Sequence, residues 1–310
     1  MIFVRDIKKV TIIGLGALGI LFGHQLAKKM SKADLRFVAD RERINRYETD
    51  HVYCNGERCD FNYLTPDEKC EPADLLIFTV KYDGLKDALE AARHHIGDQT
   101  IILSALNGIT SEAVIGQAYG DEKILYCVAQ GMDAVKVGNH LTFDHSGILC
   151  FGDQEPGVIS EKVRKVEAFF EKMAFPYEID TNMVKRQWGK FMLNVGVNQT
   201  VAVYRSNYGE IQREGQARKM MIAAMKEVIT LSEQAGIHLT EADLDYWLSV
   251  LATLSPDGKP SMAQDVEARR HSEVELFAGT VLTLANEYGI STPVNKELYD
   301  RIHSIESQYD

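Results

Sequence analysis

A lysine and two asparagines recur at every fourth position within the segment 188–198. On a helix, Lys190, Asn194 and Asn198 would fall within about 80° of one another and form one polar stripe. The rest of that segment is largely apolar, which is typical of a buried helix, where a lysine and two amides are costly without partners. A solvated polar face is the alternative interpretation. The functional interpretation is a cleft lining in which Lys190 acts as general acid.

Ser261 begins a second segment whose residue types could do chemistry. It is followed three residues later by Gln264, which predicts a capping box at the start of a helix. A helix N-terminus is also a natural place for a substrate carboxylate. Capping and substrate binding are therefore both open for Ser261, and the two roles can coexist.

Glu273 lies further along the same predicted helix. It would share a face with Val266 and Phe277, which is unusual for a carboxylate. One interpretation is a substrate-binding group. The alternative is a structural ion pair with Arg269 or Arg270, which precede Glu273 by four and three residues.

A glycine-rich turn near the N-terminus has the spacing of a dinucleotide-binding site. Gly14 would permit a tight turn, Gly16 would let the backbone approach a pyrophosphate, and Gly19 would permit close helix–strand packing. The turn follows a strand-like run and opens a helical pattern, which favours a phosphate-binding helix N-terminus over a plain turn. The predicted cofactor-binding residues of this turn are Gly14, Leu15, Gly16, Ala17, Leu18 and Gly19.

Asp40 follows the second predicted strand, about 20 residues after the turn. An acidic residue there usually binds the ribose hydroxyls and favours NAD. Its neighbours Arg41 and Arg43 could instead hold the 2′-phosphate of NADP. Asp40 and Arg41 are therefore both candidate cofactor-binding residues, and the cofactor preference stays open at this point.

Strands alternating with helices position this turn. The alternation predicts a parallel, doubly wound sheet, completed by an antiparallel stretch at 140–152. The predicted strands are 9–13, 35–39, 75–80, 100–104 and 124–129, and the clearest helices are 17–30, 86–95 and 111–118.

After residue 181 the strand-like runs disappear and long helical patterns follow. We therefore predict an α/β protein with an N-terminal dinucleotide-binding domain of Rossmann type, residues 1–181, and an all-helical substrate and catalytic domain, residues 182–310, with the active site in the cleft between them. The predicted helices of the second domain are 184–202, 213–235, 241–254, 262–288 and 296–307.

Composition narrows the class of protein. The 310 residues suggest about two domains, and the net charge of −11 disfavours nucleic acid and membranes as partners. The chain shows neither a secretory segment nor a membrane-spanning run, so a cytoplasmic protein is expected. Cys54, Cys59 and Cys70 match no common zinc spacing, and no metal site is predicted.

Several motifs, in order along the chain, together resemble the ketopantoate reductase family. Besides the glycine turn, they are the segments 79–81 (Thr-Val-Lys) and 105–108 (Ala-Leu-Asn-Gly), the Lys190, Asn194 and Asn198 helix, the segments 261–265 and 272–273, and the segment 289–295. The resemblance covers residue 10 to about 307 and implies reduction of 2-dehydropantoate to pantoate, as in pantothenate biosynthesis.

The resemblance also implies roles for individual residues. Lys190 would be the general acid and Lys81 a cofactor contact, while Asn107 would lie between cofactor and substrate. Ser261 would bind the substrate carboxylate and Glu273 its hydroxyl. Substrate contacts are also expected from Asn194 and Asn198.

The cofactor expected from the resemblance is NADP(H). The family usually has arginine where this chain has Asp40, so Arg41 or Arg43 would have to hold the 2′-phosphate, or NAD(H) is used. The chain also has Gln199 where the family favours proline, and Pro260 where a serine often precedes the Ser-Met pair. Two further functions stay open: a reductase of another branched 2-keto acid, and a non-catalytic dinucleotide sensor. A homodimer is one alternative for the assembly.

Overall fold

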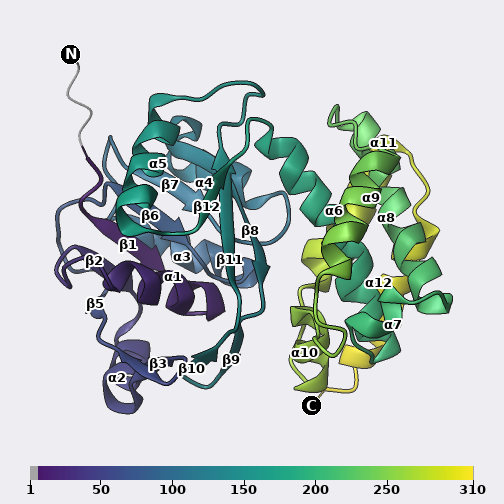
Figure 1. Ribbon diagram of the computed structural model, residues 1–310, viewed down its shortest axis with the longest axis horizontal. Helices are drawn as coiled ribbons and strands as arrows, with labels where there is room; N and C mark the ends of the chain where they lie inside the picture. The colour runs from purple at the N-terminus through teal and green to yellow at the C-terminus, as the bar shows by residue number, and fades with distance from the viewer. Residues whose placement is uncertain (1–5, 310) are drawn as a thin grey trace. The chain divides into compact units, whose positions relative to one another are not determined.

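The computed structural model describes residues 6–309 and divides into two compact units at Met183 and Val184. The first unit contains all the strands of the described chain, and the second contains only helices (Figure 1). The predicted fold class, a Rossmann-type sheet followed by a helical domain, is confirmed.

The larger sheet of the first unit has eight strands in the order β12-β11-β8-β7-β6-β1-β2-β5. The six strands from β8 to β5 are parallel, while β11 pairs antiparallel with β8. Strands β1, β2, β6 and β7 are buried along their whole length, as expected for a parallel sheet covered on both faces. The strands are β1 Val10–Ile13, β2 Leu35–Val38, β5 Asn62–Leu64, β6 Leu75–Phe78, β7 Ile101–Ser104, β8 Ile124–Met132, β11 Ser146–Gly152 and β12 Tyr177–Ile179.

Helices cover both faces of this sheet because alternate strand residues point to opposite sides. On one face, Phe22 of α1 and Phe170 of α5 share a core with Ile12. On the other face, Leu85 of α3 and Ile115 of α4 share a second core with Leu76, a strand residue that points to that side. The helices of this unit are α1 Ala17–Ala27, α2 Arg41–Asp50, α3 Leu85–Ala92, α4 Ser111–Tyr119 and α5 Glu161–Met173, with short 3₁₀ turns η1 Tyr82–Gly84 and η2 Asp121–Lys123.

A second, four-stranded sheet lies in the order β4-β3-β10-β9. It divides the predicted stretch 140–152, because β10 joins this small sheet whereas β11 joins the large one. The separation is fixed by side chains distant in sequence: Asn55 exchanges two hydrogen bonds with the backbone of Phe143, and Asp133 accepts the N–H groups of residues 144 and 145. The four strands are β3 Val52–Cys54, β4 Glu57–Cys59, β9 Val135–Val137 and β10 His140–Thr142.

The second unit is built around α6, whose middle is apolar and buried. Two glycines let its neighbours approach closely. A side chain at Gly189 would collide with the indole of Trp247 on α9, and one at Gly196 would collide with Met221 on α8. The helices of this unit are α6 Met183–Tyr204, α7 Tyr208–Gln212, α8 Gln216–Gln234, α9 Glu241–Ala252, α10 Ser261–Glu267, α11 Thr280–Tyr288 and α12 Pro293–Glu306, with a π-helical turn, η3 Glu275–Gly279.

The single helix predicted over 262–288 is wrong. Helix α10 ends at Glu267, residues 268–273 are not helical, and a π-helical turn precedes α11. Arg269 adopts a φ of 53°, which ends the helix locally. The helix predicted over 213–235 is also shortened, because α8 begins only at Gln216, after the separate short α7. The helices predicted over 17–30 and 86–95 end earlier, at Ala27 and Ala92.

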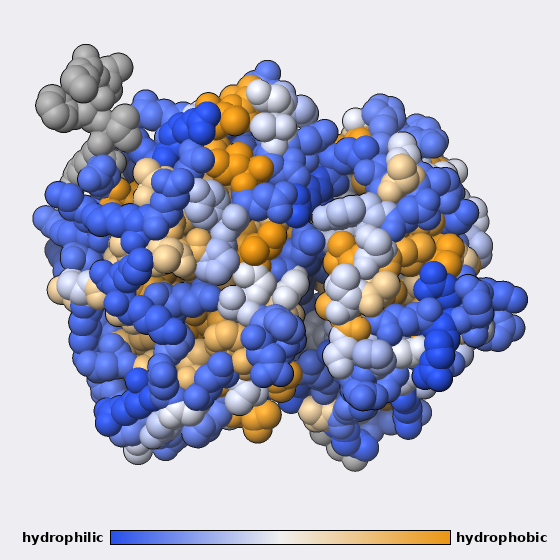
Figure 2. All heavy atoms as spheres, in the orientation of Figure 1, coloured by the Kyte–Doolittle hydropathy of each residue, from blue (hydrophilic) through white to orange (hydrophobic). Residues whose placement is uncertain are grey.

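Within the described residues, no helix is both long enough and apolar enough to cross a bilayer. The face of the molecule in Figure 2 is mainly hydrophilic, with apolar residues gathered in small patches. The exposed large apolar side chains include Val137 on the edge strand β9 and Tyr246 on α9.

Candidate active site

The three glycines of the turn after β1 differ in what their missing side chains would meet. Gly14 has a φ of 104° and lies against Val80, whose Cγ1 would be 2.8 Å from an added Cβ. A Cβ at Gly19 would collide with the Gly14 carbonyl and lie 2.7 Å from Thr79 Oγ1. At Gly16 the nearest atom would be Thr79 O at 3.5 Å, an ordinary contact. The tight turn and the close packing are thus confirmed, while the protein itself leaves room beside Gly16.

Space beside Gly16 is what a pyrophosphate needs. Gly16 is the N-cap of α1, no side chain caps that helix, and its first turn contains no acidic residue. Gly16 is exposed, and the adjacent Ala17 and Leu18 are half-buried, whereas Leu15 points into the core. The turn therefore offers backbone N–H groups and the positive end of a helix dipole to an anion, and these residues fit a dinucleotide.

Thr79, at the end of β6, holds the turn from the neighbouring strand. Its hydroxyl donates to Gly14 O at 2.8 Å and lies 3.2 Å from Ile13 O, and its backbone N–H donates to Ile13 O. The side chain is buried. Periodicity alone did not identify Thr79 as a support for the turn; its only signal was its place in the segment 79–81.

The other predicted cofactor residues follow adjacent strands. Gly14 follows β1, Asp40 follows β2, Lys81 lies three residues after β6, and Asn107 lies three residues after β7. Because β7, β6, β1 and β2 are neighbouring parallel strands, their carboxyl ends meet at one edge of the sheet. Ligands of open α/β sheets bind at this edge. Lys81 is exposed and Asn107 is half-buried.

Asp40 has a structural role that the sequence did not reveal. It is the N-cap of α2, and its carboxylate accepts the Arg43 N–H at 2.7 Å and pairs with the Arg43 Nε at 3.3 Å. Arg41 pairs with Glu68 at 3.2 Å; the Arg41 side chain is exposed and that of Glu68 is partly exposed. Arg41 also lowers the pKa of Glu68, after the larger effect of the hydrogen bond from the Thr65 backbone. These four charged groups therefore form two ion pairs, and three of the four residues closely follow β2.

The polar stripe on α6 is present in the second unit. Lys190 and Asn194 are half-buried, and Asn198 is buried with 6% of its surface exposed. Asn198 Nδ2 donates to Asn194 Oδ1 at 3.3 Å, and Ser261 Oγ donates to Asn198 Oδ1 at the same distance. The stripe is therefore not a freely solvated face, and it includes Ser261 from α10.

The predicted capping box at Ser261 is wrong. The N-cap of α10 is Pro260, which has no side-chain hydrogen bond, and Ser261 is the first helical residue. Gln264 Nε2 donates instead to Lys259 O at 3.0 Å. With Pro260 as N-cap, the third helical position is Ala263, whose side chain cannot accept a hydrogen bond, so the reciprocal bond of a capping box is absent. The hydroxyl of Ser261 is left to contact Asn198.

Glu273 lies just before the π-helical turn, outside any long helix. It is half-buried, and the helical face that it was expected to share with Val266 does not exist. The expected ion pair with Arg269 or Arg270 assumed that these residues and Glu273 share one helix, and residues 268–273 are not helical. Arg270 pairs with Asp265 at 2.9 Å, and Arg269 donates to the Gln308 carbonyl.

The described residues contain no cluster of metal ligands, and the buried thiols of Cys54 and Cys59 are not reactive. Among residues 6–309, no group of three or more histidine, cysteine or acidic side chains could hold a metal ion. Burial raises the pKa of Cys54 to about 11 and that of Cys59 to about 12, which keeps both thiols protonated at neutral pH.

Two family descriptions match the chain. Residues 10–155 match the family described as ketopantoate reductase PanE/ApbA, and residues 182–306 match ketopantoate reductase PanE/ApbA C terminal. The 2-dehydropantoate 2-reductase of Streptococcus pyogenes is 26% identical over 303 residues, which cover 96% of this chain and 98% of that protein.

Solved structures share the same fold. A PanE/ApbA family ketopantoate reductase from Ralstonia eutropha JMP134 is 22% identical with a TM-score of 0.84, covering 97% of this chain and 99% of that one. A D-mandelate dehydrogenase in complex with NADH is 21% identical with a TM-score of 0.86, covering 97% and 100%.

The fold and the glycine turn define a Rossmann-type dinucleotide-binding architecture followed by a helical unit. The two family matches cover both parts in sequence order, and the chain belongs to the ketopantoate reductase family, whose members are NAD(P)H-dependent oxidoreductases. The resemblance inferred from the sequence motifs is thereby confirmed.

Proposed function

We propose that this protein reduces 2-dehydropantoate to pantoate, a step of pantothenate biosynthesis, with NADPH as the preferred reductant. The observation that carries the proposal is the half-buried stripe of Lys190, Asn194 and Asn198, joined to Ser261 on an otherwise apolar helix. A lysine and amides in such a place suit a small polar substrate better than they suit a packed core.

The cofactor would supply the hydride that reduces the keto carbon. In this proposal Gly16 and the N-terminus of α1 hold the pyrophosphate, and Lys81 and Asn107 contact the cofactor further along the sheet edge. Arg41 would take the 2′-phosphate of NADPH, whereas Asp40 would favour the ribose hydroxyls of NADH. Asp40 is already engaged by Arg43, which supports NADPH as the first choice.

The residues of the helical unit would bind and polarise the substrate. Reduction places negative charge on the keto oxygen, where the Lys190 ammonium stabilises it and donates a proton. Asn194 and Asn198 orient the substrate. Ser261 binds its carboxylate, and Glu273 accepts a hydrogen bond from its distal hydroxyl. A site built for that hydroxyl discriminates strongly against substrates that lack it.

A reductase of another 2-keto acid is the second candidate. It is favoured by the likeness in fold to a D-mandelate dehydrogenase that was solved with NADH. The half-buried Glu273 argues for a substrate with a hydrogen-bond donor away from the keto acid group. A dinucleotide sensor without turnover would need neither Lys190 nor Glu273.

Side-by-side rate assays test the proposal. Initial rates with NADPH and NADH are measured on 2-dehydropantoate and on ketoisovalerate, which lacks the hydroxymethyl group. We expect the highest kcat/KM for 2-dehydropantoate with NADPH. A preference for ketoisovalerate would favour the second candidate, and cofactor binding without oxidation across a panel of 2-keto acids would favour a sensor. Comparable rates with NADH would reject Arg41 as the determinant of cofactor preference.

A further inference from the structure

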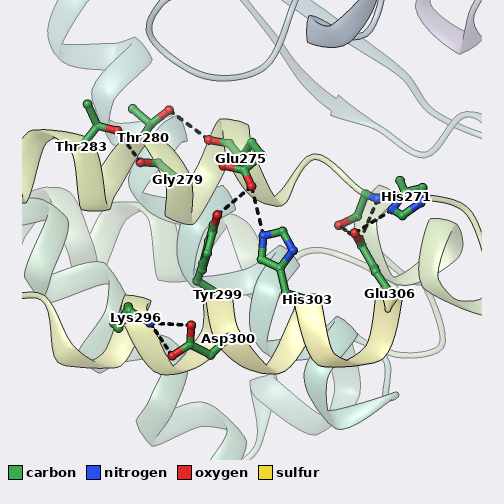
Figure 3. A network of polar contacts seen from close by, with 11 residues as sticks. His271, Glu275, Gly279, Thr280, Thr283, Lys296, Tyr299, Asp300, His303 and Glu306 are labelled. Carbon is green, nitrogen blue, oxygen red and sulfur yellow. Dashed lines mark hydrogen bonds and ion pairs between the residues drawn. The ribbon is translucent and has the colours of Figure 1, made fainter. Parts of the chain in front are cut away.

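A buried carboxylate on α12 holds the break between α10 and the π-helical turn. Glu306 is only 5% exposed, and its Oε1 accepts the backbone N–H of Ser272 at 2.9 Å and the Ser272 hydroxyl at 2.6 Å. Its Oε2 lies 3.1 Å from His271 Nδ1. Figure 3 shows Glu306 directed from α12 toward this segment. A buried carboxylate is tolerated because several donors satisfy it.

The same helix holds the chain a second time, two residues after Glu273. The Glu275 carboxylate accepts a hydrogen bond from the Tyr299 hydroxyl at 2.8 Å and lies 3.0 Å from His303 Nε2 (Figure 3). Tyr299, His303 and Glu306 are spaced by four and three residues, so they lie on one side of α12. One face of one helix therefore contacts the chain on both sides of Glu273.

Glu273 thus lies between two anchors. Residue 272 before it is tied to Glu306, and residue 275 after it is tied to Tyr299 and His303. Its own carbonyl accepts the N–H groups of residues 276 and 277, which starts the helical turn. The backbone of a residue outside regular helix is therefore fixed by long-range contacts, and π-helical turns of this kind are frequent at functional sites.

We propose that Glu306 is a positioning residue that fixes Glu273 and thereby sets the preference for a 2-keto acid with a distal hydroxyl. The inference rests on the proposed function, in which Glu273 binds that hydroxyl. Without Glu306, the N–H and hydroxyl of Ser272 lose a buried acceptor, and the segment must move to find new partners. A misplacement of about 1 Å in a site can lower the rate by up to about 10²-fold.

The test measures a ratio of specificity constants. For each variant, kcat/KM for 2-dehydropantoate is divided by kcat/KM for ketoisovalerate, with the cofactor saturating. The variants are Glu306→Ala, Glu306→Gln, Ser272→Ala and Glu273→Ala. Asp300→Ala is the matched control, because it removes a carboxylate from the same helix whose partner is the exposed Lys296 (Figure 3).

Glu306→Ala should lower this ratio on the order of tenfold through loss of activity on the hydroxylated substrate. Glu306→Gln keeps an acceptor for the Ser272 N–H, so it should lie nearer to wild type, and Ser272→Ala should show a smaller loss in the same direction. Asp300→Ala should leave the ratio unchanged. The affinity for cofactor should stay unchanged in all four of these variants.

A double-mutant cycle separates positioning from general damage. If Glu306 acts through Glu273, then Glu306→Ala should not change the ratio further in a Glu273→Ala background. An unchanged ratio in both Glu306→Ala and Ser272→Ala, or an equal loss in the Glu273→Ala background, overturns the inference. If Glu306→Ala fails to fold, Ser272→Ala and Glu306→Gln still decide the question.

Failure of the proposed function would look different. If the wild type does not distinguish the two substrates, or if Glu273→Ala leaves the ratio unchanged, the role of Glu273 itself is wrong. A discriminating wild type and a collapsed Glu273→Ala ratio, together with intact ratios in the Glu306 and Ser272 variants, would reject only the inference about Glu306.

Discussion

At the scale of single residues, the turn after β1 separates a glycine that a ligand requires from one that the fold requires. Alanine at Gly16 would meet no atom of the described chain closer than 3.5 Å, whereas alanine at Gly19 would collide with the Gly14 carbonyl. Gly16→Ala should therefore keep its melting temperature and weaken NADPH binding by roughly tenfold, or about 1.4 kcal/mol.

Gly19→Ala provides the contrast, since its overpacking should destabilise the fold by about 1–3 kcal/mol. Calorimetry of ligand binding and thermal unfolding of the apoproteins would measure both effects. Unchanged NADPH affinity in Gly16→Ala would show that the pyrophosphate does not lie against this residue.

Lys190 carries the second residue-scale prediction. As general acid, its removal in Lys190→Ala should lower kcat by about 10²–10⁴-fold while cofactor affinity stays near wild type. Lys185→Ala is a control on the same helix, because Lys185 pairs with Asp243 of α9 at 3.0 Å. Steady-state kinetics at saturating NADPH, with fluorescence titration of the cofactor, would test this. Near-normal turnover by Lys190→Ala would reject its catalytic role.

Residue types and spacing were sufficient to identify the α6 stripe and the glycine turn, because both depend on local periodicity. They were not sufficient for Asp40, whose second role as the N-cap of α2 is a matter of backbone geometry. Thr79 and Glu306 were also missed as supporting residues. Each acts through contacts with residues more than 30 positions away, which spacing along one helix cannot indicate.

At the scale of elements, the turn that follows α3 contains a buried histidine that should make stability depend on pH. His95 is fully buried, and its Nδ1 lies 3.2 Å from Cys70 Sγ. Burial, reinforced by the positive charge of Arg36, lowers the pKa of His95 from 6.5 to about 4. Between those pH values the unfolded chain binds a proton that the folded chain does not, so the free energy of unfolding should fall as pH drops from 6.5 toward 4.

Urea unfolding at several pH values between 7 and 4 would measure this effect in the wild type and in His95→Leu. The variant should show a shallower loss of stability over that range. His24, whose pKa burial also lowers, is present in both proteins, so its contribution cancels in the difference. Parallel curves for the two proteins would mean that His95 does not titrate differently on folding.

The strands and helices of the parallel sheet were predictable because buried strands and amphipathic helices alternate clearly in the sequence. The small sheet was not, since its three-residue strands are too short for a period to register. Helix α5 was missed although Ser160 caps it and its buried residues recur at helical spacing. The helix predicted over 262–288 failed for a different reason. The chain leaves the helix at Arg269, where φ is 53°, and in the break Ser272 donates two hydrogen bonds to Glu306 of the distant helix α12.

At the scale of the whole molecule, the chain offers separate reporters for its two units. Both tryptophans, Trp188 on α6 and Trp247 on α9, belong to the second unit and are buried. The glycine turn and the residues at the carboxyl ends of β2, β6 and β7 belong to the first unit. Tryptophan fluorescence therefore reports unfolding of residues 184–310, while calorimetry reports unfolding of the entire chain.

This division leads to a prediction for the effect of cofactor on thermal unfolding. NADP⁺ at about 100 times its dissociation constant should stabilise the unit that binds it by about 2.7 kcal/mol. For a unit of this size, each kcal/mol of stabilisation raises the melting temperature by roughly 2–4 °C. If the two units unfold separately, NADP⁺ should raise a calorimetric transition while the midpoint seen by tryptophan fluorescence moves much less. Equal shifts of both signals would instead show that the two units unfold together. A shift confined to the fluorescence signal would mean that the cofactor binds the second unit, which would contradict the prediction.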